Sequence, residues 1–466
     1  MADTYISRAA TGSVTSSTTF TFSFWLKRGD LNRTQTVFMH ENASGHYEKF
    51  QLELQSDNTF RVSIYDGSTE FNYDTNMLFR DTSGWYNIVV RWDTTQSTST
   101  DRVRIYVNGS QITFDNANGS TATMPNQNFA INLGEKIMVW GRYQASSPGA
   151  YFNGSLSYCQ YADGQSYAPT TFGSIDSVTG QWKINTNATV TYGDNGFFIL
   201  KNGNRVINDA GNSSGNFAVS GGTLTKTEDS PSNVFTTMNP LNHDYANTDT
   251  VLENGNTYVK PQSNSNYNYA MSTLAMPKGN GKFYFEVKNI QYDNIERAFG
   301  IVNMDYASEI FYQNRRLVTA SNNTYIGRVF LTSAGHSIIS GTANSGYGTA
   351  WTSNDILSMA CDMENGAFYF RKNGDAWLNS GVPTSGSTKT GAIDISSSSQ
   401  WTTSSDWGIW CGDGAANHDR FAWNFGNGYF QTTAVSSAGT NASGNGIFEY
   451  DVPTGFTALS TKGLNL

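Results

Sequence analysis

The chain of 466 residues is poor in charged residues, proline and cysteine, and each shortage argues against a class of protein. Charged residues make up 14%, and Lys and Glu are scarce, which argues against helical bundles. The three cysteines, Cys159, Cys361 and Cys411, are too few and too scattered for a disulfide framework. Two of them lie in strand-like runs, where we expect free buried thiols.

Basic stripes and long apolar runs are also missing. The formal net charge of -9 disfavours nucleic acid as a partner, because phosphate binding needs a basic surface. Without a run of about eighteen apolar residues, we expect no membrane insertion. The start, Met1-Ala2-Asp3-Thr4, has no basic region followed by an apolar core, so we expect no secretory signal.

Aromatic residues and turn formers are abundant. Aromatics make up 14% of the chain, there are 45 Gly against 9 Pro, and Ser, Thr and Asn dominate the polar residues. This composition is typical of many short strands joined by polar turns, and the length suits two or three domains. We predict an all-β fold of two antiparallel β-sandwiches, over residues 1–173 and 234–466, joined by a turn-rich connector with short strands at 174–233.

The stretch 354–377 carries the clearest strand signal. Apolar residues alternate with small or polar ones over 357–363, which predicts a strand with one buried face. Asn365-Gly366 predicts a tight hairpin, the alternation resumes over 367–371, and Asn373-Gly374 is a second turn signal. We therefore expect three strands in succession.

This stretch resembles the most recognisable segment of the SPRY domain. The runs KFYFEV (282–287) and AFGIV (298–302) resemble the opening of that domain, and Asn424-Phe425-Gly426 matches a feature near its end. The resemblance implies a SPRY-like β-sandwich in the C-terminal half.

The N-terminal segment is similar to another sandwich family. Phe20, Phe22, Phe24 and Leu26 alternate with Thr21, Ser23 and Trp25, which predicts a strand covered by a second sheet. FTFSFWLKR (20–28), GWYNIVVRWD (84–93), RVRIYVNGSQI (102–112) and FNGSLSY (152–158) resemble the concanavalin A-like, laminin-G-type jelly roll in order. Lectins, pentraxins and glucanases share this pattern, so it implies a fold and leaves the function open.

Longer runs resemble virion proteins of marine bacteriophages: NGFFILKNG (195–203), DAGNSSGNF (209–217), DSPSNVFTTMNPL (229–241) and VPTGFTALSTKGLNL (452–466). The resemblance implies a non-enzymatic structural component of the particle, made in the host cytoplasm and released by lysis. The first expectation is a tail fibre or tail-associated appendage that binds host surface glycans. A capsid-decorating or vertex-fibre protein and a free carbohydrate-binding lectin are the alternatives. The implied partners are other virion proteins, a host surface polysaccharide, and further copies of the chain, as in a trimer.

Catalytic patterns are weak. The Glu-x-Asp-x-x-Glu strand of glucanases is absent, and Glu449-Tyr450-Asp451 only begins it. His40 and His46 bracket Glu41, a weak metal hint for which a solvated loop is the favoured interpretation. We therefore expect no enzyme and no cofactor, with calcium left open.

Two sets of residues are candidate ligand contacts. Jelly-roll lectins bind calcium through acids and amides in rim loops, which suggests Asp30, Asn32, Asp93 and Asp115, although such residues near Gly more often form turns. Sugar sites need an aromatic platform, which suggests Tyr143, Tyr151, Trp351 and Trp401 in loop-like surroundings. A core or interface role is the alternative for each of these rings.

Overall fold

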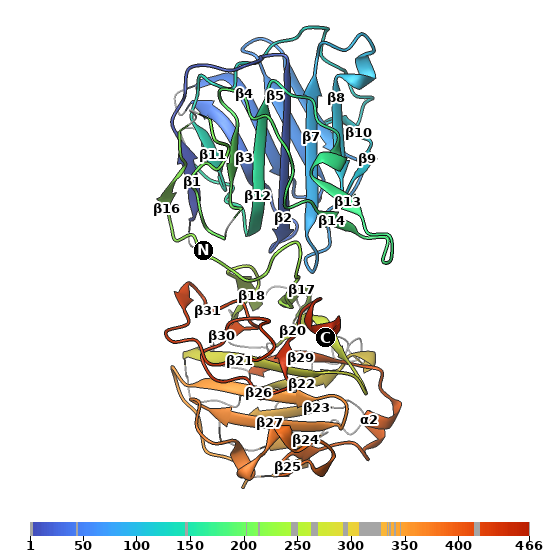
Figure 1. Cartoon of the computed structure of the whole chain (residues 1–466), viewed down its shortest axis with the longest axis vertical. Coiled ribbons are helices and arrows are strands. Elements are labelled where there is room, and N and C mark those ends of the chain that lie inside the picture. The colour runs from blue at the N-terminus through green and yellow to red at the C-terminus, as the bar shows by residue number, and fades with distance from the viewer. Residues whose placement is uncertain are drawn as a thin grey trace. The chain divides into compact units, whose positions relative to one another are not determined.

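The computed structural model describes residues 3–42, 45–144, 148–201, 203–212, 215–243, 250–261, 269–291, 297–306, 328–332, 334, 337–339, 342–344, 346–413 and 420–465. The chain divides into two compact units, Met1–Lys226 and Thr227–Leu466 (Figure 1). Each unit is built from two large, mainly antiparallel sheets, which confirms the predicted all-β class.

Over its described residues, the first unit has an eight-stranded and a six-stranded sheet. The larger runs in spatial order β10 (Phe114–Asn116), β6 (Glu70–Thr75), β5 (Phe60–Tyr65), β4 (Gly45–Leu54), β3 (Gln35–Asn42), β11 (Met138–Trp140), β1 (Tyr5–Arg8) and β16 (Ala218–Gly221). The smaller runs β15 (Phe197–Ile199), β12 (Gly154–Asp163), β2 (Thr19–Arg28), β7 (Tyr86–Asp93), β8 (Val103–Val107) and β9 (Ser110–Ile112). A separate hairpin pairs β13 (Gly173–Ile175) with β14 (Trp182–Ile184), and two 3-10 turns are η1 (Ser99–Asp101) and η2 (Pro169–Thr171).

The predicted alternation of β2 is confirmed. Phe20, Phe22, Phe24 and Leu26 are fully buried in the core of the first unit. The Phe22 ring lies 4.9 Å from that of Phe50 on the opposite sheet and 4.6 Å from that of Tyr161. The two sheets thus face each other across an aromatic core, as the sequence pattern predicts.

The stretch 174–226 belongs to the first unit and is not a separate connector. β15 pairs with β12, and β16 pairs with β1. Phe197 and Ile199 are fully buried in the core. The boundary predicted at residue 173 is therefore wrong, and the first unit ends at Lys226. The prediction failed because strands of three and four residues between Gly- and Asn-rich turns are too short to show a clear period.

The second unit also has two large sheets. One runs β17 (Met238–His243), β20 (Tyr269–Pro277), β29 (Asp406–Asp413), β22 (Arg297–Asn303), β23 (Arg328–Thr332), β24 (Ser337–Ile339) and β25 (Thr342–Asn344). The other runs β18 (Thr250–Glu253), β19 (Tyr258–Pro261), β30 (Arg420–Asn424), β21 (Lys282–Gln291), β26 (Ile356–Asp362), β27 (Ala367–Lys372) and β28 (Ile393–Asp394), and β33 (Thr457–Ala458) adds a parallel pair to β21. The short pieces are β31 (Tyr429–Phe430), β32 (Thr433–Ala434), α2 (Ser399–Thr403), η3 (Met304–Tyr306), η5 (Leu378–Ser380), η6 (Pro383–Thr388) and η7 (Gly463–Asn465).

The hairpin at the centre of the second unit follows the sequence prediction in part. β26 and β27 pair with Asp362 opposite Ala367, and Gly366 takes a φ of 64° in the turn between them. The prediction of a third strand directly after this hairpin is wrong. Asn373 and Gly374 both have positive φ and turn the chain, but the next residues lack the alternation of a strand and form η5 and η6.

All three cysteines are free and buried, as expected for two of them. Among the described segments, none of the helices has the length and apolar character needed to cross a membrane.

Candidate functional site

One face of the eight-stranded sheet carries polar side chains in rows across the strands. Along β4, Phe50, Leu52 and Leu54 pack in the core, so the intervening Gln51 and Glu53 project to the opposite face. The same alternation on the neighbouring strands β3, β5 and β6 adds five polar residues to this outer face, which makes seven. We call this set the polar strip: Thr36, Gln51, Glu53, Arg61, Ser63, Asn72 and Asp74.

Strand register places the strip in two rows. In the first, Thr36, Glu53, Arg61 and Asp74 are successive cross-strand partners, and Asp115 on β10 is the partner of Asp74. In the second row, which lies two residues along each strand, Gln51, Ser63 and Asn72 are partners. Since neighbouring strands are about 4.8 Å apart, the first row spans roughly 19 Å from β3 to β10.

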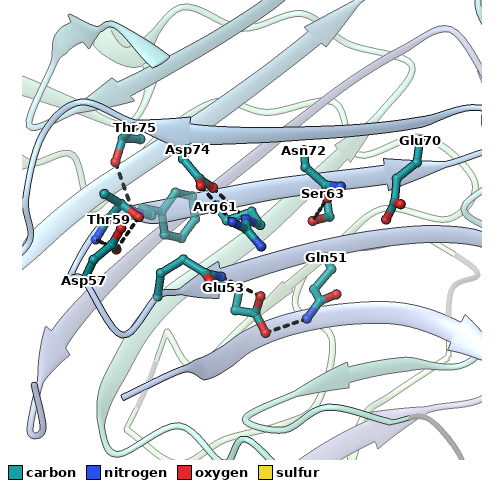
Figure 2. A network of polar contacts seen from close by, with 12 residues as sticks. Gln51, Glu53, Asp57, Thr59, Arg61, Ser63, Glu70, Asn72, Asp74 and Thr75 are labelled. Atoms are coloured by element: carbon teal, nitrogen blue, oxygen red, sulfur yellow. Dashed lines mark hydrogen bonds and ion pairs between the residues drawn. The ribbon is translucent and has the colours of Figure 1, made fainter. Parts of the chain in front are cut away.

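The strip is held in place by its own hydrogen bonds (Figure 2). Arg61 donates two hydrogen bonds to Asp74, from Nε to Oδ1 at 2.6 Å and from Nη2 to Oδ2 at 2.7 Å. Glu53 accepts from Gln51 at 2.8 Å and from Gln55 at 2.7 Å. Ser63 donates to Asn72 Oδ1 at 2.5 Å. Such contacts fix the side-chain positions before any ligand arrives.

Arg61 is the central cation of the strip. The hydrogen bonds to Asp74 raise its pKa above the ordinary value, against the opposing effect of partial burial, and the nearby charge of Glu53 also raises it. Paired fork to fork with a carboxylate, its guanidinium has a fixed orientation.

Tyr151 lies at the β3 end of the strip. Beyond β11, residues 150–152 run beside β3: the Thr36 amide donates to the Ala150 carbonyl at 2.7 Å, and Tyr151 forms a parallel bridge with Thr36. Bridge partners share a face of the sheet, so the half-buried Tyr151 adjoins the strip. Tyr143, also half-buried, belongs to the same loop, which contacts the outer face where the Gln144 amide reaches the sulfur of Met39 at 3.2 Å. The structure thus places both predicted tyrosines near the polar strip.

The prediction that Trp351 and Trp401 form sugar platforms is wrong. Trp351 is 1% exposed and Trp401 is 6% exposed, and both pack in the core of the second unit. The Trp401 ring, on the short helix α2, lies 5.7 Å from that of Trp407. Buried indoles have no free face to stack on a sugar, so the alternative of a core role holds for both.

The first two calcium candidates lie in the loop after β2, beside a buried cation. Asp30 pairs with Arg33 at 3.0 Å, and the side-chain oxygen of Asn32 accepts a hydrogen bond from Asn58 at 2.9 Å. Asn58 also accepts from Arg28, whose guanidinium is buried and whose pKa burial lowers to about 10. A positive group already lies where a calcium ion would have to bind.

The other two candidates are far from this loop. Asp93 is the partner of Thr19 at the opposite end of β2, roughly 30 Å from Arg28 along the strand. It accepts from Thr95 and Gln96, while Asp115 lies on β10 of the other sheet. Among the described residues, no three His, Cys, Asp or Glu side chains gather where a metal could be held. The four residues therefore do not fit one calcium site, and the turn interpretation explains Asp30 and Asn32 better.

The residues with weak catalytic or metal-binding patterns make structural hydrogen bonds instead. Glu449 accepts from the Ser436 amide at 2.9 Å, and Asp451 accepts from the Thr440 amide at 2.7 Å, so both carboxylates join the segment 449–451 to the segment 436–440. His40 is buried and accepts from the Lys136 amide at 3.2 Å. The side chains of Glu41 and His46 lie outside the described residues.

A second polar cluster, in the core of the second unit, was not predicted. Glu286 on β21 is fully buried, and its carboxylate accepts from the Tyr284 hydroxyl (2.8 Å), the Glu449 and Tyr450 amides (2.8 and 2.9 Å) and the Asn424 side-chain amide (3.2 Å). Burial raises its pKa to about 7, although the hydrogen bonds oppose the shift. Two motifs that carry the SPRY resemblance, KFYFEV and Asn-Phe-Gly, meet at this carboxylate, which binds the C-terminal segment to the sheet.

Comparison with known proteins agrees with the sandwich fold. Residues 1–160, about a third of the chain, match a family model described as the concanavalin A-like lectin/glucanases superfamily. No curated protein matches the chain.

Three solved structures are examples of those similar to this chain. The SPRY domain of human HERC1 is 12% identical, with 40% of this chain and 96% of that chain covered and a TM-score of 0.29. The heptameric SAP-like pentraxin from Limulus polyphemus is 14% identical, with 42% and 86% covered and a TM-score of 0.28. Domains LG4-5 of the mouse laminin alpha1 chain are 8% identical, with 98% and 84% covered and a TM-score of 0.28.

Proposed function

We propose that the chain is a non-enzymatic structural component of a bacteriophage particle, a tail fibre or tail-associated appendage that binds host surface glycans through the polar strip and Tyr151. The observation that carries the glycan-binding part is the pre-arranged row of acid, amide and guanidinium groups on an outer sheet face, with a half-buried tyrosine at its end.

The chemistry of this face suits a carbohydrate. Sugar hydroxyls both donate and accept hydrogen bonds, and the half-buried members of the strip offer the carboxylates of Glu53 and Asp74, the guanidinium of Arg61 and the amide of Asn72. The other three members, Thr36, Gln51 and Ser63, are buried and support these groups from within the sheet face. A tyrosine ring provides an apolar surface for the carbon face of a sugar ring. A row spanning four or five strands suits an extended oligosaccharide better than a single sugar.

The virion role rests on the motif resemblance over four runs between residues 195 and 466, and the match of residues 1–160 to a lectin-containing superfamily supports an adhesive module. Closed assembly, such as a trimer, and docking on other virion proteins belong to the same proposal. A capsid-decorating or vertex position would leave the glycan-binding chemistry unchanged.

The test is binding of the purified full chain to immobilised surface polysaccharide from the host strain. Tyr151→Ala should weaken binding by about tenfold, the loss expected for one stacked ring. The matched control is Asp394→Asn, which breaks an exposed ion pair to Lys389 in the second unit and should leave binding unchanged. Equal binding by wild type and Tyr151→Ala, with both folded, would refute the assigned site, and no binding by wild type would refute the glycan role.

A further inference from the structure

We infer, on the basis of the proposed glycan-binding function, that the outer face of the first unit selects neutral or amino-bearing glycans and rejects acidic ones. The selection arises from the state of the charged groups on this face. Its cations are already paired, and carboxylates without a cationic partner remain.

Arg61, the cation best suited to grip an acidic sugar, is already engaged. Bidentate binding of a carboxylate needs two adjacent N–H groups of a guanidinium, and Asp74 takes Nε and Nη2. An incoming uronate or sulfate would have to displace Asp74, which is attached to the neighbouring strand and partly buried.

The other cations near the strip are engaged as well. Lys49, the partner of Tyr65 in the next row, pairs with Glu70 at 3.1 Å. Arg142, in the loop that carries Tyr143, stacks over the Tyr5 ring at 3.6 Å and donates to Gln144 at 2.7 Å.

Two carboxylates on the face have no cation of their own. Glu53 is bonded by neutral donors, Thr36, Gln51 and Gln55, and enters no ion pair within the described part of the chain. Asp115, at the β10 end of the first row, is half-buried and likewise without an ion pair among the described residues. The rows hold two cations, Lys49 and Arg61, and four carboxylates. Two positive and four negative charges give these rows a formal net charge of -2, the carboxylates being those of Glu53, Glu70, Asp74 and Asp115.

The consequence is a bias in ligand charge. A ligand anion about 5 Å from one unpaired carboxylate in water loses about fourfold in affinity, and two such carboxylates add to the penalty. A neutral sugar suffers no such loss, and an ammonium group near Glu53 or Asp115 gains a similar factor. The bias should fade in high salt, since these groups are solvent-exposed in part.

The test uses three polysaccharide probes on the full chain at low salt: dextran as neutral, partly deacetylated chitosan oligosaccharide as amino-bearing, and alginate as acidic. Wild type should bind at least one of the first two and bind alginate at least tenfold more weakly. Asp74→Asn frees the Arg61 guanidinium and should raise alginate affinity by about tenfold, whereas Glu53→Gln removes one charge without breaking an ion pair and should raise it by about fourfold.

The control separates local chemistry from net charge. Asp394→Asn makes the same change in formal charge but breaks an ion pair, that of Lys389, in the second unit, so it should not raise alginate binding. Wild type that binds alginate as tightly as the other probes overturns the selectivity, as does an equal gain in Asp394→Asn and Asp74→Asn. Wild type that binds none of the three probes, nor the host polysaccharide, overturns the proposed function itself. Thermal unfolding of each variant checks that it is folded.

Discussion

Glu286 should make the second unit lose stability as the pH rises through neutrality. Its carboxyl has a pKa of about 7 in the folded chain, raised by burial from an ordinary value of 4.5. A raised pKa means that the folded state keeps a proton that the unfolded state has released. The stabilising contribution is therefore fully present below about pH 4.5 and is lost as the pH passes through about 7.

The size of the effect can be worked out from the shift. One pKa unit corresponds to about 1.4 kcal/mol, so Glu286 should lower the free energy of unfolding of the second unit by about 3 kcal/mol between about pH 4.5 and about pH 8. Glu286→Gln cannot titrate. The glutamine also loses an acceptor for the Asn424 side chain and the Glu449 amide, but that cost is the same at both pH values and cancels in the difference.

The assay reads each unit separately through its buried thiols. Cys361 and Cys411 lie in the second unit and Cys159 in the first, and all three are fully buried. Urea titrations with a brief pulse of a pyridyl disulfide reagent, scored by mass spectrometry, report the unfolding of each unit. Wild type should show the 3 kcal/mol change at Cys361, the Glu286→Gln variant should not, and Cys159 should behave alike in both. An equal change at Cys361 in wild type and variant would contradict the assignment of the shift to Glu286.

Three further outcomes are expected. Phe22→Ala should destabilise the first unit by about 4 kcal/mol, because the ring is fully buried between Phe50 and Tyr161, and a second-unit transition that moves with it would contradict the division into two cores. Trp401→Ala should destabilise the second unit by about 3 to 5 kcal/mol in urea titrations and leave glycan binding unchanged. A loss of glycan binding by the folded variant would show that Trp401 contacts the sugar after all. Gly109→Ala should be more destabilising than Gly119→Ala, since both have positive φ but only at Gly109 does an added Cβ meet the Trp182 ring, at 2.3 Å; equal melting temperatures would argue against that packing.

Much of the fold could be predicted from two-residue alternation. β2, β7, β8, β21, β26 and β27 are long enough for the period to show, and Asn108-Gly109 and Gly366 adopt the positive φ values that their turns require. The short strands β15 and β16 could not be assigned to the first unit, because nothing local shows that Phe197 packs against rings such as Phe22 and Phe38, more than a hundred residues earlier. The third strand expected after Asn373-Gly374 failed because a turn signal does not specify the conformation of the residues beyond the turn.

The candidate site could be predicted only in fragments. The alternation of Gln51, Leu52, Glu53 and Leu54 marks a strand with a polar face, and this signal could have pointed to the polar strip. That Arg61 meets Asp74 depends on the register set by the turn between β5 and β6, which composition does not reveal. The prediction for the two tryptophans was wrong because Gly- and Ser-rich surroundings do not ensure that a ring is exposed.

The four calcium candidates do not converge on one site, and the sequence could not show this for a related reason. Acids and amides near glycines occur in metal loops and in turns alike, and only the fold reveals whether they converge. Here the opposite ends of β2 separate Asp30 from Asp93, and the buried Arg28 lies beside Asn32.

Cryo-electron microscopy of intact particles of the phage that we propose encodes this chain, at a resolution that places both units, tests the central claim most directly. We predict density for the chain on the particle, at the tail, with the row from Glu53 to Asp115 and Tyr151 open to the surroundings. Density on the capsid would keep the glycan face and move the protein to the decorating position. Particles that lack the chain, or that bury this row against a neighbouring subunit, would contradict the proposed role.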